Sequence, residues 1–211
     1  MKIIATNIGE KREVQYRGKT VVTGIYKYPV AEGIYLESTD VKNDMVVDRK
    51  YHGGIDKACY LYSLEAYSFF KNLFPDADWS YGMFGENLTV LGLDERLIKV
   101  GAKYQIGEAI IEVSEPRQPC FKQGIRMGTQ AVLKPFINST HSGVYVRVLQ
   151  NGHVKPEDEL QLVENKPDNP TIAEAFYCLY QPELKRSLID KVLNCEELAV
   201  SCKNDIQRRL G

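Results

Sequence analysis

The chain has 211 residues, and this length predicts one main domain with a small additional segment. Its 27 Lys and Arg residues almost balance its 28 Asp and Glu residues, and hydrophobic residues make up 44% of the chain. The near-neutral charge excludes a nucleic-acid coat and a polybasic membrane binder. The composition excludes collagen-like, coiled-coil and wholly disordered proteins.

The sequence predicts a cytoplasmic protein without a membrane segment. No apolar run approaches the roughly 18–20 residues of a membrane-spanning helix. Residues 1–8 predict a first strand rather than an export signal, because Thr6 and Asn7 interrupt the apolar run. Five cysteines without a CxxC pair indicate reduced thiols, which are typical of the cytoplasm.

A mainly β domain is predicted for residues 1–164. Short runs of β-branched and aromatic residues alternate with turn residues, a pattern typical of a β-barrel or a sandwich. Near the end of this region, alternation places Arg147 on the face opposite three valines, and Asn151-Gly152 predicts a hairpin turn before the last strand. The expected strands are Lys2–Ile8, Thr20–Lys27, Ile34–Leu36, Ala58–Tyr62, Leu88–Leu91, Lys103–Ile106, Ala109–Ser114, Val144–Leu149 and Glu159–Val163.

Helical patterns are few in the first region and dominate the second. A helix is expected at Leu64–Phe74, and a short helical turn at Phe121–Met127. After the polar linker Glu164–Pro170, Thr171 and Glu174 have the spacing of a capping box. Residues 165–211 are therefore expected to form a small C-terminal three-helix bundle.

The near-zero total charge conceals an asymmetry along the chain. The 41 residues from Pro116 to Pro156 contain no Asp or Glu and carry six Lys or Arg residues, so this window has a charge of +6. A local positive field in a neutral protein favours a small anionic ligand, and the alternative is a solvated basic surface.

The segment Glu115-Pro-Arg-Gln-Pro-Cys-Phe-Lys122 has the strongest chemical signal. Two prolines stiffen the chain before Cys120, and Arg117 and Lys122 lie beside it in sequence. Nearby cations stabilise a thiolate, the form that attacks electrophiles or binds a soft metal. The alternative is a buried structural cysteine.

Two glycine-containing segments carry further candidates. Adjacent glycines at Gly53-Gly54, within DRKYHGGIDK at 48–57, predict backbone N–H groups that converge on an anion, with His52 and Lys57 on either side. In GMFGENLT at 82–89, Asn87 follows a loop suited to a ligand. The alternatives are an ordinary turn in the first segment and a strand-entry turn in the second.

The combination of segments resembles the MOSC domain family, in particular its YiiM-type branch. The resemblance is carried in order by HGGIDKA at 52–58, GMFGENLTVLGL at 82–93, VSEPRQPCFK at 113–122 and GVYVRVL at 143–149. It implies a MOSC β-barrel for residues 1–164, and the three-helix bundle at 165–211 is similar to the tail of this branch.

The resemblance also implies a function and a cofactor. It implies an oxidoreductase that binds the molybdenum cofactor (molybdopterin) and reduces N-hydroxylated compounds such as 6-hydroxylaminopurine to amines. A separate flavoprotein reductase would supply the electrons. Whether the chain forms a homodimer is left open.

The expected site residues follow from the resemblance and from the motifs. Cys120 is the expected molybdenum ligand, and His52 and Lys57 are, with Cys120, the expected catalytic residues. His52, Lys57 or Arg117 would donate a proton to the leaving hydroxyl group of the substrate or polarise it. The expected cofactor-binding residues are Arg49, Gly53, Gly54, Asn87, Arg117, Gln118, Lys122 and Arg147. Two other functions stay open: a non-catalytic carrier of the cofactor, and a cysteine redox protein without a metal.

Overall fold

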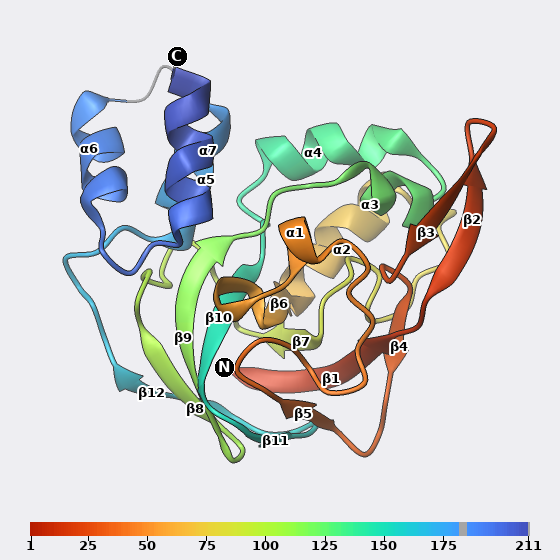
Figure 1. The fold of residues 1–211 in the computed structure, drawn as a ribbon, viewed down its shortest axis with the longest axis horizontal. Coiled ribbons are helices and arrows are strands. Elements are labelled where there is room, and N and C mark those ends of the chain that lie inside the picture. The colour runs from red at the N-terminus through yellow and green to blue at the C-terminus, as the bar shows by residue number, and fades with distance from the viewer. Residues whose placement is uncertain (182–184, 211) are drawn as a thin grey trace.

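The computed structural model describes residues 1–181 and 185–210. A large, strongly bent sheet forms the main body, and helices lie along one end of it (Figure 1). The first strands are β1 (Lys2–Gly9), β2 (Arg12–Tyr16), β3 (Lys19–Thr23), β4 (Lys27–Pro29), β5 (Ile34–Leu36), β6 (Cys59–Ser63) and β7 (Leu88–Leu91). The later strands are β8 (Lys103–Ile106), β9 (Ala109–Pro116), β10 (Val144–Gln150), β11 (Gly152–Val154) and β12 (Leu160–Glu164).

The helices before the C-terminal segment are short, apart from α2. They are α1 (Arg49–His52), α2 (Leu64–Leu73), α3 (Phe121–Arg126) and α4 (Leu133–Asn138), with single 3₁₀ turns at Ile55–Lys57 and Gln130–Val132. The expected helices at 64–74 and 121–127 are therefore present. The described residues contain no helix that is both long and apolar enough to cross a membrane.

The mixed, mainly β class is confirmed, but the expected closed barrel is not. Eight strands form one sheet in the order β12-β8-β9-β10-β6-β7-β1-β4. Among the described residues, β12 and β4 remain its two edges, although an isolated bridge joins Lys2 to Glu159. Pairs β2-β3 and β11-β5 form two separate small sheets.

Two sequence expectations about the strands were wrong. The single strand expected at 20–27 is divided into β3 and β4, because the chain turns at Gly24, where a Cβ would lie 1.8 Å from the Met45 carbonyl oxygen. The hairpin expected at Asn151-Gly152 is absent, since β11 pairs with β5 and β12 pairs with β8. Gly152 instead packs against the backbone of Glu108, where a Cβ would come within 2.4 Å.

The expected three C-terminal helices are α5 (Ile172–Tyr180), α6 (Arg186–Asn194) and α7 (Val200–Leu210). Thr171 and Glu174 form the complete capping box at the start of α5. The Phe176 ring of α5 lies 6.2 Å from the Phe136 ring of α4, so the helices share the hydrophobic core of the sheet region. The division into domains at residue 164 stays a prediction.

Candidate functional site

One pocket brings together segments that are far apart in the sequence. It encloses about 640 Å³ when the open space at its mouth is included. Its wall consists of the loop after β3, the loop before α1, the first residues of β6, the turn before β7 and the segment that follows β9. The parallel pairing of β6 with β7 places the residues that precede both strands at the same edge of the sheet.

The pocket contains some of the expected site residues and not others. Its lining includes six of them: His52, Lys57, Asn87, Arg117, Cys120 and Lys122. Among the described residues, the following expected binders are not part of the lining: Arg49, Gly53, Gly54, Gln118 and Arg147.

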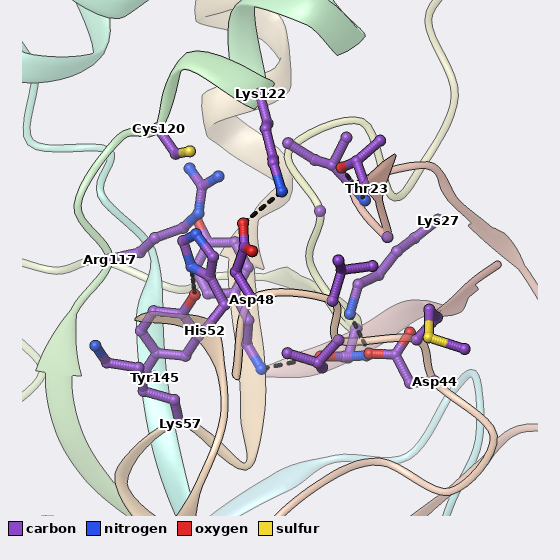
Figure 2. A pocket seen from close by; sticks show the side chains of 18 of the residues that line it. Thr23, Lys27, Asp44, Asp48, His52, Lys57, Arg117, Cys120, Lys122 and Tyr145 are labelled. Atoms are coloured by element: carbon purple, nitrogen blue, oxygen red, sulfur yellow. Dashed lines mark hydrogen bonds and ion pairs between the residues drawn. The ribbon is translucent and has the colours of Figure 1, made fainter. Parts of the chain in front are cut away.

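Cys120 lies at one end of the pocket, beside the guanidinium of Arg117 (Figure 2). Pro116 ends β9, and Cys120 has an extended backbone directly before α3, so the thiol leaves the sheet on a short irregular segment. Cys120 is partly exposed, whereas the other four cysteines are buried. It is therefore the cysteine that a ligand in the pocket can reach.

Arg117 is buried and only partly bonded. Its Nη2 donates to Gln123 Oε1 at 3.2 Å, and its guanidinium lies over the Tyr60 ring at 5.3 Å. Its Nη1 is also buried but has no hydrogen-bond partner among the described residues. Because an unsatisfied buried N–H costs about 1–3 kcal/mol, this atom is a strong candidate to bind an anion in the pocket.

His52 and Tyr145 form a polar pair beside Arg117. The Tyr145 hydroxyl lies 3.4 Å from His52 Nδ1. Burial raises the pKa of Tyr145 to about 12, so the phenol keeps its proton and can donate it to Nδ1. Burial and the nearby Arg117 and Lys57 cations lower the pKa of His52 to about 4. The imidazole is thus uncharged at neutral pH, and in the tautomer that accepts a hydrogen bond from Tyr145 its proton lies on Nε2.

The uncharged state of His52 makes stability depend on pH. Since the pKa of His52 is lower in the folded chain than in the unfolded chain, the unfolded state binds more protons between about pH 4 and 6.5. We expect the wild type to lose about 2–3 kcal/mol more unfolding free energy than His52→Gln when the pH falls through this range. Urea unfolding of both proteins at several pH values measures the difference, and parallel curves would contradict it.

Lys57 lines the pocket with its stem, but its ammonium points away from Cys120. Figure 2 shows the ammonium on the outer side of the Tyr145 ring, 5.8 Å from the ring centre. There it lies 3.3 Å from Glu115 Oε1 and donates to the Tyr51 carbonyl at 3.1 Å. The structure therefore favours His52 and Arg117 over Lys57 as groups that touch a ligand near Cys120.

The opposite end of the pocket is a buried ion pair that the sequence did not indicate. Lys27 binds Asp44, and their side chains are 8% and 2% exposed (Figure 2). Asp44 also accepts from Gly9 N at 2.8 Å and from Asn87 Nδ2 at 3.0 Å. Asn87 therefore reaches the pocket as expected, and it also bonds the backbone N–H of Tyr60 at 3.2 Å.

Lys122 and the wall around it complete the pocket. Lys122 binds the carboxylate of Asp48 and donates to the Val22 carbonyl at 3.0 Å, which ties α3 to β3. The adjacent wall includes a close contact between two backbone segments: at Gly24, a Cβ would lie 1.8 Å from the Met45 carbonyl oxygen. This part of the pocket has no room for another side chain.

The expected binders outside the pocket have other partners. Arg49 pairs with Asp40 on the surface, and Gly53 and Gly54 connect α1 to the next 3₁₀ turn. Arg147 lies on the face opposite the valines, as expected, but its guanidinium pairs with Asp56 at 2.6 Å and Glu112 at 2.7 Å.

Gln118 faces α7 rather than the pocket, where it bonds Asp205 at 2.7 Å. Several pocket residues were not expected as site residues from the sequence: Thr23, Lys27, Asp44, Asp48, Tyr60 and Tyr145. Of these, only Tyr145 carried a usable signal, since it shares the face of Arg147 in an alternating strand.

Comparison with known proteins agrees with this arrangement. The sequence model of the MOSC domain family matches residues 48–161 of this chain. YflK of Bacillus subtilis is 30% identical over 98% of this chain and 93% of its own. A Gibberella moniliformis protein named reductase is 30% identical over 70% of this chain, a match that covers 27% of that protein.

A solved structure matches the whole chain. The crystal structure of YiiM from Geobacillus stearothermophilus has a TM-score of 0.82 and 28% identity, and the match covers 100% of this chain and 99% of that one. The similarity includes the three C-terminal helices as well as the sheet. The chain belongs to the MOSC domain family, and its structure is of the YiiM type.

Proposed function

We propose that this protein is a molybdenum-dependent oxidoreductase that reduces N-hydroxylated compounds to amines, with 6-hydroxylaminopurine as a representative substrate. Electrons come from a separate flavoprotein reductase. The proposal is supported by the MOSC match, the YiiM-type fold and the relative named reductase. The observation that carries it is the position of the Cys120 thiol in one pocket with Arg117, whose buried Nη1 has no hydrogen-bond partner in the described part of the chain.

The residues of the pocket fit the molybdenum cofactor. A cysteine thiolate is a soft ligand suited to molybdenum, and Cys120 lines the cavity and is partly exposed. The cofactor ends in a phosphate, and Arg117 Nη1 has an unused donor for an anionic group. The charged groups of Lys27, Arg117 and Lys122 line the pocket against the carboxylates of Asp44 and Asp48, so the lining has one excess positive charge.

The reaction is balanced by two electrons and two protons. A compound R–NH–OH accepts them and yields R–NH₂ and water as the N–O bond breaks. When bound, the molybdenum cofactor supplies the two-electron chemistry for this step. The protein has to bind the substrate, orient the N–O bond and deliver protons to the leaving oxygen.

The pair of His52 and Tyr145 is placed for the proton step. With its proton on Nε2, uncharged His52 donates a hydrogen bond to the hydroxyl oxygen of the substrate, and Tyr145 fixes the ring orientation. Arg117, next to both, stabilises negative charge on the leaving oxygen. The rings of Tyr60 and Tyr145, 5.1 Å apart, form an aromatic wall against which a flat base can lie.

One assay tests the function. The protein is produced in cells that make the cofactor, and the molybdenum content per chain is measured. The loaded protein is then combined with a flavoprotein reductase, its reductant and 6-hydroxylaminopurine, and formation of adenine is followed by chromatography. We expect turnover that requires both the metal and the reductase. Bound metal without turnover would instead identify a carrier, and turnover without metal would identify a cysteine redox protein.

A further inference from the structure

Residues 199–209 of the C-terminal segment contact residues 114–118, which form the end of β9 and the start of the loop that leads to Cys120. Ala199 N donates to the Ser114 carbonyl at 3.2 Å, and the Ser201 hydroxyl lies 3.3 Å from Glu115 Oε1. Further along the loop, α7 binds the side chain of Gln118. The three helices are therefore bonded to the end of β9 and to the residues that lead to Cys120.

The contact at Gln118 uses both ends of the side-chain amide. Gln118 Nε2 donates to Asp205 Oδ2 at 2.7 Å, and Gln118 Oε1 accepts from Arg209 Nη2 at 3.1 Å. Gln118 lies between Pro116 and Pro119, which have no backbone N–H with which to hold this segment. The side chain of Gln118 thus provides an anchor that the adjacent backbone cannot.

Arg209 is itself fixed by a second helix. Its Nη1 donates to the Leu179 carbonyl at 2.8 Å, and its guanidinium lies 4.4 Å from the centre of the Tyr180 ring. Both residues belong to α5, whose inner face is part of the shared core. The loop with Cys120 is therefore connected through Gln118 to a rigid pair of helices.

We propose that Asp205 and Arg209 are positioning residues for Cys120, which they hold in place through Gln118. On this view the helical segment completes the metal site from outside the pocket. The inference rests on the proposed role of Cys120 as a metal ligand. It assigns a supporting role to two residues that lie more than 80 positions from the loop in the sequence.

Thiol reactivity tests the positioning role without the metal. The native apo-protein is treated with iodoacetamide, and alkylation of Cys120 is followed by mass spectrometry. Loss of a hydrogen bond to a charged group should free the loop, so Asp205→Ala should raise the alkylation rate about tenfold. Asp205→Asn keeps an acceptor for Gln118 and should remain near the wild-type rate. Arg208→Ala, which breaks the ion pair of Arg208 with Asp205 at 3.1 Å but leaves the bond to Gln118, is the matched control and should also stay near the wild-type rate.

Gln118→Ala removes the same contact from the loop side and leaves α7 intact, so it should reproduce the effect of Asp205→Ala. In holoprotein, both alanine variants should release molybdenum about tenfold faster during dialysis. Wild-type rates of alkylation and release in Gln118→Ala would overturn the positioning role. If Cys120→Ser held molybdenum as the wild type does, the proposed metal ligand itself would be wrong, which is a separate result.

Discussion

The Cys120→Ser variant should retain at least about 100-fold less molybdenum than the wild type. Replacing a thiolate with a hydroxyl exchanges a soft ligand for a hard one, and loss of a direct ligand should exceed the 10–100-fold effect of losing a supporting contact. Because Cys120 is partly exposed and lies outside the hydrophobic core, its replacement should change the unfolding free energy by only about 0.5 kcal/mol. Metal and pterin content per chain and a thermal melt measure the two quantities.

A second cysteine distinguishes loss of the ligand from loss of any thiol. Cys195 is buried at the end of α6, away from the lining of the pocket. The Cys195→Ser variant should keep its molybdenum even if its melting temperature falls. Equal molybdenum content in wild type and Cys120→Ser would rule out Cys120 as the ligand.

The Asp44→Ala variant should lose about 3–5 kcal/mol of unfolding free energy. The substitution leaves the buried ammonium of Lys27 without its counter-ion, and it also removes the acceptor for Gly9 N and Asn87 Nδ2. An uncompensated buried charge is costly because protein interiors stabilise ions poorly. Equilibrium unfolding in urea measures the loss.

An exposed ion pair provides the control for this effect. Arg186 and Asp190 pair on α6 at 3.0 Å, with side chains 84% and 49% exposed. Removing Asp190 should cost no more than about 0.5 kcal/mol, since water replaces the lost partner. A loss below about 1 kcal/mol for Asp44→Ala would show that Lys27 is solvated rather than dependent on Asp44.

The fold could be predicted where local signals agree with the tertiary structure. The capping box at Thr171 and the alternation around Arg147 both specify the observed element. The hairpin at Asn151-Gly152 could not be excluded from sequence, because a close approach to Glu108 decides the local path. Strand β2 gave no signal, since its residues are largely polar and its pairing is confined to β3.

The candidate site could be predicted only in part, because some of its residues come from segments that are distant in the sequence. The segment from the end of β9 to the first turn of α3 brings Arg117, Cys120 and Lys122 to the pocket because they are neighbours in sequence. The charge of +6 between Pro116 and Pro156 does not produce a strongly positive pocket, for two reasons. Arg147 pairs with two carboxylates outside the pocket. In addition, the carboxylates of Asp44 and Asp48 enter the pocket from another segment. Charge along a chain is therefore a poor measure of charge within a cavity.

The close backbone contact at Gly24 limits how the specificity of the pocket can change. At Gly24, which lines the pocket, a Cβ would lie 1.8 Å from the Met45 carbonyl oxygen, so a larger residue here would collide with the main chain of a neighbouring segment. The loop that packs on Gly24 also lines the pocket, with Met45, Val46 and Val47. Divergence towards substrates of different size should therefore be concentrated in residues 45–47, while Gly24 stays constant.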